Sequence, residues 1–423
     1  MIAGSNATVD QQLPSAQELP VSFAGMQSTR TAPVRMLMVA NVAAMFRDFL
    51  NPFATHFRNK GWRVDAIARD IEHSADCNGV FDNAWDVKWS RNPFGIENFI
   101  EAPRAFLKRV EDAGYDLIHV HTPVPAFIAR WMTARIPLPR RPKMIYTAHG
   151  FHFHNYGSRW KNRAFVGLEK LAGRWTDCLI VINRTDKEAA RFHRLVPADK
   201  IVLMPGIGIK RRDYDCDAVS DDAVRRFRNE LGLRSDERII VMLAEFAPGK
   251  RHKDAVHAFA SMANRNVHLV LAGEGPLQAE ISALTARLGV ENRVHLVGFR
   301  RDVPAILKSS ALKILPSERE GLPKSIMEAL NMGLPVVGTD VRGIRDLLAD
   351  GAGVLVPLGD VAALAKAMDW VLDHPVESKL LGDRGRSRMN IYERDHVIRL
   401  HEDLYARLLN DPLQRPSTNS QQS

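Results

Sequence analysis

LKILPSEREGLPKSIMEALNMGLPVVG, residues 312–338, is the stretch that decides the fold. It starts with an apolar run that predicts a strand, Leu312–Leu315, and continues into a polar turn. A helix is predicted to begin at Pro323, where the missing N–H costs nothing, and to end at Gly333. Pro335 prevents the helix from resuming and opens a second apolar run. Strand, loop, helix and strand in this order are the repeating unit of a parallel sheet.

Two glutamates have a special position on this unit. Glu320 lies in the predicted loop just before the helix, and Glu328 lies on the helix itself. The N–H groups at the start of the helix, residues 323–326, favour an anion such as a diphosphate. One short element would therefore offer an anion site and two acceptors for hydroxyl groups, as a nucleotide sugar requires. The alternative is an ordinary strand–helix unit with solvated glutamates, because glutamate is common on exposed helices.

Length and composition describe a soluble globular protein. The 423 residues suffice for two domains of ordinary size, and no apolar run reaches the roughly 18 residues of a membrane span. Residues 1–33 lack the basic start and apolar centre of a signal peptide, so they and residues 411–423 are predicted to be disordered tails. Three scattered cysteines form neither a disulfide framework nor a metal knuckle, which favours a reducing, cytoplasmic compartment.

Positive charge is concentrated in the first half. Residues 34–212 contain 29 Lys and Arg against 17 Asp and Glu. Basic side chains interleaved with Trp are typical of proteins that lie on an anionic membrane. Nucleic acid would suit this composition too, but no helix-turn-helix, zinc or aromatic-platform signature accompanies it, and solvated helix faces are the plainer alternative. The two basic clusters are Arg130, Trp131, Arg135, Arg140, Arg141 and Lys143, and Arg159, Trp160, Lys161, Arg163, Lys170, Arg174 and Trp175.

Apolar runs alternate with amphipathic stretches along the chain, which predicts Rossmann-like, doubly wound α/β domains. Residues 34–212 form one such domain and residues 221–394 a second, joined near 207–220. A last amphipathic helix, residues 395–410, has no strand after it and is expected to pack back on the first domain. The predicted strands are 35–40, 62–67, 116–121, 143–147, 178–182, 201–204, 238–243, 267–271, 294–297, 312–315 and 335–338, and the first helix is predicted over 48–61.

Weaker motifs follow several strand ends, where the ligands of such sheets bind. Lys250 and Arg251 are candidates for binding a phosphate there, with a solvent-exposed turn as the alternative. His149 ends another strand and lies at the rim of the sheet. The two histidines in 119–121 face the same side of a strand, where packing is the expected role. The histidines in 151–154 are closely spaced, but no carboxylate or cysteine flanks them, so no metal site is predicted.

The motif Glu320-Gly-Leu-Pro-Lys-Ser-Ile-Met-Glu328 resembles the E-x7-E motif of the family 4 glycosyltransferases of GT-B fold. The resemblance covers about residues 35–410 and implies two Rossmann-like domains that face each other across a cleft. The order of the accompanying motifs is similar to the bacterial capsule and exopolysaccharide branch of that family. These motifs are 119–123, 147–153, 205–209, the Lys250 loop and 273–276.

The resemblance implies a role for each matching position. Glu320 would bind donor-sugar hydroxyls and stabilise charge at the anomeric carbon, and His149 would face the sugar from the other domain. The reaction would be retaining and independent of metal or any other cofactor, with a nucleotide sugar, a UDP-sugar, as substrate. A lysine and a helix N-terminus can neutralise the departing diphosphate without a cation. The donor-binding residues would be Lys250, Arg251, Glu328, Gly321, Leu322, Pro323, Lys324, and the main chain near Phe299 and Arg300.

Two positions depart from the family pattern. Many members have an arginine five residues before the phosphate-binding lysine, and this chain has Glu245 there, so a second cation must come from elsewhere, with Arg251 as the candidate. Many members also have a glycine-rich loop after the first strand, whereas residues 40–45 contain no glycine. Both departures concern contacts to the diphosphate rather than the Glu320/Glu328 pair.

These observations predict a cytoplasmic glycosyltransferase attached peripherally to the inner face of the plasma membrane. It would transfer a hexose or N-acetylhexosamine from a UDP-sugar to a lipid-linked glycan in capsule, exopolysaccharide or lipopolysaccharide synthesis. The basic first half would face the membrane and the phosphates of the acceptor, with no role for nucleic acid. A UDP-sugar 2-epimerase of the same fold is an alternative. A basic, non-enzymatic membrane scaffold is another, but it leaves the two glutamates without a role.

Overall fold

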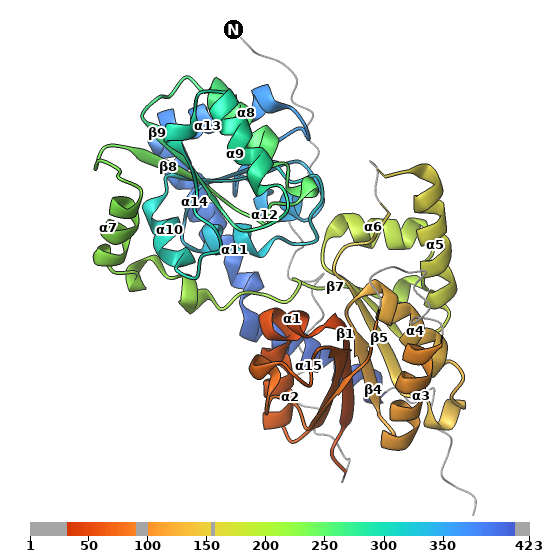
Figure 1. The fold of residues 1–423 in the computed structure, drawn as a ribbon. Coiled ribbons are helices and arrows are strands. Elements are labelled where there is room, and N and C mark those ends of the chain that lie inside the picture. Colours follow the sequence, from red (N-terminus) through yellow and green to blue (C-terminus); the bar gives the residue numbers. More distant parts are fainter. Residues whose placement is uncertain (1–31, 90–99, 154–156, 411–423) are drawn as a thin grey trace, which may run out of the picture.

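The computed structural model describes residues 32–89, 100–153 and 157–410, so the predicted tails lie almost entirely outside the described residues. The described chain forms two parallel β-sheets with helices packed against them (Figure 1). One sheet and its helices form the lower, orange-to-yellow half of the picture, and the other forms the upper, green-to-blue half. The predicted α/β class with two Rossmann-like domains is confirmed.

The first sheet has seven strands in the order β3-β2-β1-β4-β5-β6-β7. Its inner strands are apolar because helices cover both faces, and parallel sheets occur almost only in that setting. Alternate side chains of the first strand enter two separate cores: Leu37 and Val39 enter one, and Met36 and Met38 the other. The strands are β1 (Arg35–Val42), β2 (Arg63–Arg69), β3 (Asn83–Asp86), β4 (Leu117–Val120), β5 (Lys143–Ala148), β6 (Cys178–Val181) and β7 (Ile201–Leu203).

The second sheet has six strands in the order β10-β9-β8-β11-β12-β13. The chain runs outward in one direction from β8 and in the other direction from β11. The loops that follow these two strands therefore diverge, which is where ligands of doubly wound sheets bind. The strands are β8 (Arg238–Leu243), β9 (Val267–Ala272), β10 (Val294–Leu296), β11 (Leu312–Leu315), β12 (Val336–Thr339) and β13 (Val354–Val356).

Most of the helices lie in the connections between successive parallel strands, which need crossovers of this kind, and the last three follow the last strand. None of those in the described ranges is both long enough and apolar enough to cross a bilayer. They are α1 (Ala43–Met45), α2 (Asn51–Asn59), α3 (Glu101–Ala113), α4 (Pro123–Thr133), α5 (Arg159–Gly173), α6 (Arg184–Phe192), α7 (Asp221–Glu230), α8 (His252–Ser261), α9 (Gln278–Arg287), α10 (Val303–Ser309), α11 (Lys324–Asn331), α12 (Ile344–Leu348), α13 (Val361–Asp373), α14 (Pro375–Arg388) and α15 (Arg394–Asn410).

The sequence pattern misplaces the first helix and misses several elements. The helical conformation begins directly after β1, passes through a π-helical turn at Phe46–Leu50 and continues as α2, instead of starting at residue 48. The reason is a buried stripe that already includes Phe46 and Leu50. Strand β3 was missed because its four residues are only half-buried at the sheet edge and form no apolar run. Strand β13 and helices α6, α12, α13 and α14 were also missed.

The last helix, α15, crosses back to the first domain. Its Tyr405 hydroxyl lies 2.6 Å from Nδ1 of His119 on β4, and its Glu402 accepts hydrogen bonds from His56 and Lys60 of the α2 region. Just before this helix the chain also contacts the linker, because the carbonyl of Tyr392 accepts a hydrogen bond from the N–H of Ile209. In Figure 1 this helix is the blue segment beside α1 and α2. The two domains are therefore joined by the linker and by α15.

Candidate active site

The candidate donor site lies at the carboxyl edge of the second sheet, between the loops after β8 and β11. These loops touch, because the N–H of Glu318 donates a 2.8 Å hydrogen bond to the carbonyl of Gly249. The contact places two residues that are far apart in sequence on one side of the edge. Lys250 Nζ lies 2.6 Å from Glu320 Oε1, with the glutamate side chain 10% exposed and the lysine 29%.

This ion pair joins two residues with different predicted ligands: the resemblance assigns the diphosphate to Lys250 and the sugar hydroxyls to Glu320. An anion near Glu320 alone would be repelled, whereas the ammonium group of Lys250 attracts it. A diphosphate would compete with Glu320 for the ammonium group of Lys250. Once Lys250 binds the diphosphate, the carboxylate of Glu320 is available to hydroxyl groups. The pair is therefore compatible with both predicted roles.

Glu328 lies deeper, on the inner side of α11. It is 6% exposed, and its Oε1 accepts a hydrogen bond from the Tyr214 hydroxyl at 2.5 Å. Lys324, one turn earlier on the same helix, lies 3.3 Å from the same oxygen. Burial and the neighbouring carboxylate raise the pKa of Tyr214, so the phenol stays a hydrogen-bond donor at neutral pH. Tyr214 comes from the linker, and the sequence pattern did not identify it.

The N-terminus of α11 is smaller as an anion site than predicted. The helix begins at Lys324, with Pro323 as the capping residue in an extended conformation. The N–H of Ile326 already donates to the Pro323 carbonyl at 3.1 Å, so the predicted set of donors at 323–326 loses one member. Pro323 itself has no N–H. The N–H groups of Lys324 and Ser325 are therefore the ones that a helix start leaves without partners inside the helix.

The opposite wall of the cleft comes from the first sheet. Partly buried His149 follows β5, and its Nε2 lies 3.3 Å from Nδ1 of His121, which follows β4. Behind them, His119 is buried and bonds Thr147 at 2.7 Å, as expected for a packing role. Loss of hydration lowers the pKa of His149 to about 4, and burial also lowers the pKa of His121 and His119. All three rings are therefore neutral at pH 7.

The two domains touch directly at this point. Arg342, from the loop after β12, reaches across and pairs with Asp186 of α6 at 2.8 Å, with both side chains buried. Asn183 also donates from the first domain to the carbonyl of Gly321, at 3.2 Å. A Cβ atom added at Gly321 would lie 1.9 Å from the carbonyl oxygen of His149. The E-x7-E loop and the histidine wall are therefore packed against each other.

The other predicted donor-binding residues are spread around this centre. Leu322 packs against Gly206 of the first domain. Arg251 has left-handed backbone and pairs with Asp254 at 2.6 Å, so it is a poor candidate for the second cation of the site. Phe299 is 66% exposed. Arg300 directs its side chain to Glu230 and Asp302, which raise its pKa, so only its main chain is available to a nucleotide base.

Comparisons with known proteins identify the chain. The family model of the glycosyl transferases group 1 matches residues 224–388, and that of a glycosyl transferase 4-like domain matches residues 49–206. EpsD of Bacillus subtilis (strain 168), which is named as a glycosyltransferase, is 30% identical over 88% of this chain and 96% of its own length. The chain belongs to the group 1 glycosyltransferases. The resemblance to family 4 and the GT-B fold is confirmed.

One further relative and one solved structure of similar fold have names that state a substrate or a ligand. The UDP-Gal:alpha-D-GlcNAc-diphosphoundecaprenol alpha-1,3-galactosyltransferase of Escherichia coli is 27% identical over 64% of this chain and 69% of its own length. The crystal structure of Alr3699/HepE from Anabaena in complex with UDP and glucose superposes with a TM-score of 0.73 at 18% identity, covering 89% of this chain and 99% of that one. At that identity the second likeness shows the fold alone.

The structure of the glycosyltransferase adds residues that the sequence reasoning missed. Tyr214 holds Glu328, and Arg342 with Asp186 joins the domains, but these contacts link residues distant in sequence. Lys313 is fully buried on β11. It could have been singled out from the sequence, because it is the one charged residue in an apolar run. Among the described residues, no group of three or more His, Cys, Asp or Glu side chains is arranged to hold a metal ion.

Proposed function

We propose that this glycosyltransferase transfers a hexose or N-acetylhexosamine from a UDP-sugar to a lipid-linked glycan, in the synthesis of a cell-surface polysaccharide. The observation that carries the proposal is the cluster of Lys250, Glu320 and Glu328 at the diverging loops of the second sheet. It offers a cation for a diphosphate and two carboxylates for hydroxyl groups within one edge of the sheet. The UDP-Gal donor in the name of the Escherichia coli relative supports the choice of base.

The donor is proposed to lie with its diphosphate at Lys250 and the start of α11. Glu328, fixed by Tyr214, then accepts from the ribose hydroxyls, and Glu320 accepts from the sugar hydroxyls once Lys250 has turned to the phosphates. These contacts are charge-assisted hydrogen bonds, which are stronger than hydrogen bonds between neutral groups. The main chain near Phe299 is left to contact the uracil ring.

The proposed chemistry is retaining and needs no metal ion. The bond between the anomeric carbon and the β-phosphate oxygen breaks, and the acceptor hydroxyl forms the new bond on the same face. The acceptor proton passes to the departing phosphate oxygen, and UDP leaves. Lys250 and the N-terminus of α11 offset the growing negative charge, which is the kind of preorganised stabilisation that lowers a barrier most. His149 is neutral at pH 7, so it supplies a polar wall and not a proton.

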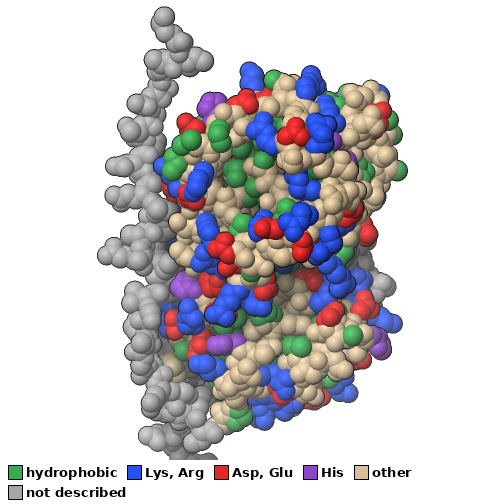
Figure 2. Space-filling model, turned by 90° about the vertical axis from the view of Figure 1, so that its left-hand side faces the viewer, with side chains coloured by type: hydrophobic (Ala, Val, Ile, Leu, Met, Phe, Trp, Pro, Cys, Tyr) green, Lys and Arg blue, Asp and Glu red, His purple; other side chains and the backbone are tan. Residues whose placement is uncertain are grey.

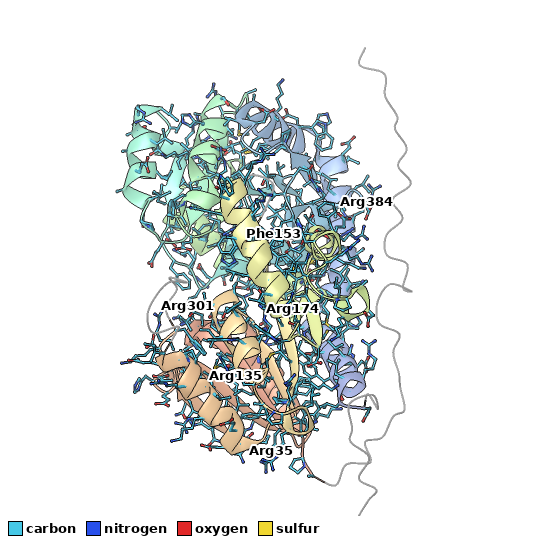
Figure 3. The ribbon with its side chains drawn as sticks, turned by 90° about the vertical axis from the view of Figure 1, so that its right-hand side faces the viewer. Arg35, Arg135, Phe153, Arg174, Arg301 and Arg384 are labelled. Carbon is cyan, nitrogen blue, oxygen red and sulfur yellow. The ribbon has the colours of Figure 1, made fainter. Side chains whose placement is uncertain are left out.

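The proposed acceptor side is the first domain, through helix α5. Trp160, Leu168 and Leu171 are 77%, 46% and 40% exposed and recur along the helix, which faces the viewer in Figure 3. Glu169 is turned inward to Arg130 at 3.0 Å, so the outward charge of the helix is positive. Apolar and basic groups together suit an anionic membrane. The adjoining cavity of about 970 Å³ has five cations in its lining, Lys170, Arg174, Arg191, Arg194 and Lys200.

The face on the opposite side of the molecule has a different character. Figure 2 shows Lys and Arg side chains interleaved with Asp and Glu over both domains there. A mixed surface of this kind gives little attraction to a charged bilayer. The proposal therefore places the α5 side against the inner leaflet, with the enzyme on the cytoplasmic side.

The donor assignment is tested with purified protein and a panel of UDP-, GDP- and ADP-sugars, without added metal, in a thermal-shift assay. At a concentration of 100 times the dissociation constant, a ligand adds about 2.7 kcal/mol of stability. We expect UDP-sugars to stabilise the wild type and Lys366→Ala, whose lysine is on α13, but not Lys250→Ala. Equal stabilisation of both variants, or none of the wild type by any nucleotide, would refute the proposed donor site.

The reaction type is tested by following the nucleotide and the sugar separately. A transferase releases UDP only when an acceptor is present, whereas a 2-epimerase would convert the UDP-sugar without one. Glu320→Gln keeps the shape of the side chain and should abolish transfer with little change in melting temperature.

Membrane attachment is tested by flotation with vesicles that contain anionic lipid. Binding at low salt that is lost in Trp160→Ser/Leu168→Ser supports the α5 surface, and unchanged binding contradicts it.

A further inference from the structure

Lys313 is a buried lysine without a carboxylate partner, directly beneath the candidate donor site. It lies at the second position of β11 and is 0% exposed. Its backbone pairs with β8 on one side and β12 on the other, so the side chain starts in the middle of the sheet. Lysine is almost never fully buried unless it is paired, because an unpaired charge in a protein interior is costly.

The ammonium group is directed along its own strand toward the carboxyl edge. Nζ donates to the carbonyl of Ile314, the next residue, at 2.9 Å. In the ranges that the structure describes, no Asp or Glu comes within ion-pair distance of Lys313, and this carbonyl is the one hydrogen-bond partner of Nζ. An ammonium group has three N–H donors, so its hydrogen-bonding capacity is used only in part.

The charged groups that face Lys313 are those of the donor site. Glu328 on α11 and Glu320 in the loop after β11 attract its positive charge, and Lys250 in the loop after β8 repels it. His252 at the start of α8 also feels its charge, and that ring is neutral at pH 7 because burial lowers its pKa to about 4. In the unbound site each of the two carboxylates already has a lysine beside it, Lys250 at Glu320 and Lys324 at Glu328. A nucleotide diphosphate adds further negative charge.

We propose that Lys313 is a positioning residue of the donor site: its buried ammonium group is a further cation that offsets the diphosphate from beneath, and the nucleotide drives a proton onto it when it binds. The inference rests on the proposed donor site. It assigns to Lys313 the charge for which Arg251 was the sequence candidate, since Arg251 is held by Asp254. Lys313 acts through its field and through Glu320 and Glu328, and it does not need to touch the ligand.

The protonation state supports this arrangement. Burial lowers the pKa of Lys313 to about 7, against the opposing effect of Glu328 and Glu320. At pH 8 only about one tenth of a group with such a pKa carries its proton. A bound diphosphate favours the charged form and raises the pKa of Lys313, so binding at pH 8 takes a proton from the buffer. The terminal phosphate of UDP, with a pKa of about 6, is already ionised at that pH.

Isothermal titration calorimetry tests the inference. UDP is titrated at pH 8 in two buffers that differ in ionisation enthalpy, and the difference in heat gives the protons taken up per nucleotide. The proteins are the wild type, Lys313→Met, which keeps the length and apolar stem of the side chain, and Lys308→Met. Lys308 is the matched control, because it lies on α10 and pairs with Asp221 away from the site. Uridine, which has no phosphate, is the ligand control.

We expect the wild type and Lys308→Met to take up more than half a proton with UDP and none with uridine. Lys313→Met should take up none and should bind UDP at least tenfold more weakly at pH 7, while melting at a higher temperature without ligand. Binding of UDP by the wild type without proton uptake, or the same uptake by Lys313→Met, would overturn the role of Lys313 and leave the donor site standing. Failure of the wild type to bind UDP would overturn both.

Discussion

Replacing Gly321 with alanine should push the loop of Glu320 and the wall of His149 apart by roughly 1.4 Å and slow transfer about 100-fold. The added Cβ atom would lie 1.9 Å from the carbonyl oxygen of His149 and 3.0 Å from its carbon. The backbone of Gly321 is not in the left-handed region, so alanine costs nothing in the loop itself. The whole effect must therefore come from the contact between the domains.

The size of the effect follows from the distance. A carbon atom and a carbonyl oxygen approach to about 3.3 Å, so one side must retreat by roughly 1.4 Å. The loop that moves contains Glu320, and the wall that it leaves contains His149. A misplacement of 1 Å can cost about 100-fold in rate, equivalent to about 2.7 kcal/mol of transition-state stabilisation. UDP binding should change little, because the proposed nucleotide contacts lie within the second domain.

The assay compares kcat/KM for sugar transfer with the dissociation constant for UDP in Gly321→Ala and Gly167→Ala. Gly167, in the middle of α5, has no atom within 4 Å of an added Cβ, so it is the same substitution without the clash. We expect kcat/KM to fall about 100-fold only in Gly321→Ala, with UDP affinity within about threefold of the wild type in both. Transfer by Gly321→Ala within a factor of two of the wild type would refute the reasoning.

Three further outcomes are expected. Arg342→Met should lower the unfolding free energy by about 3–5 kcal/mol, because the charge of Asp186 is left buried and uncompensated. Adding Asp186→Leu to the same chain should recover most of that stability. Equal stability of the single and double variants in urea titrations would contradict this. Tyr214→Phe should weaken UDP binding roughly tenfold, since a hydrogen bond to a charged group contributes about 1.5 kcal/mol or more, and calorimetry that finds unchanged affinity would remove Tyr214 from the site. Burial lowers the pKa of His401 to about 4, so the unfolded chain binds more protons between about pH 6.5 and 4, and stability should fall by up to about 3 kcal/mol as the pH drops through that range. His401→Phe should remove that share of the pH dependence, as measured by urea titrations at pH 7 and pH 4.5.

The sequence pattern predicted the parts of the molecule that depend on near neighbours. Apolar runs bounded by turns identified most of the strands, because a parallel strand is buried on both faces and must be continuously apolar. Spacing placed Glu320 and Glu328 on one loop–helix unit, and the order of the motifs identified the family. The edge strand β3 and the π-helical turn at 46–50 were misjudged, since a half-buried edge and a widened helical turn leave no clear period.

The sequence by itself therefore determined the class of fold, the family and the two glutamates, all of which follow from periodicity and short spacing. The tertiary structure decided which charges meet. It paired Lys250 with Glu320 across the diverging loops, Arg342 with Asp186 across the domains, and Arg251 with Asp254 instead of with the donor site. The first two contacts join residues at least 70 positions apart. The interaction of two charges depends on their distance and burial, which spacing along a chain does not specify.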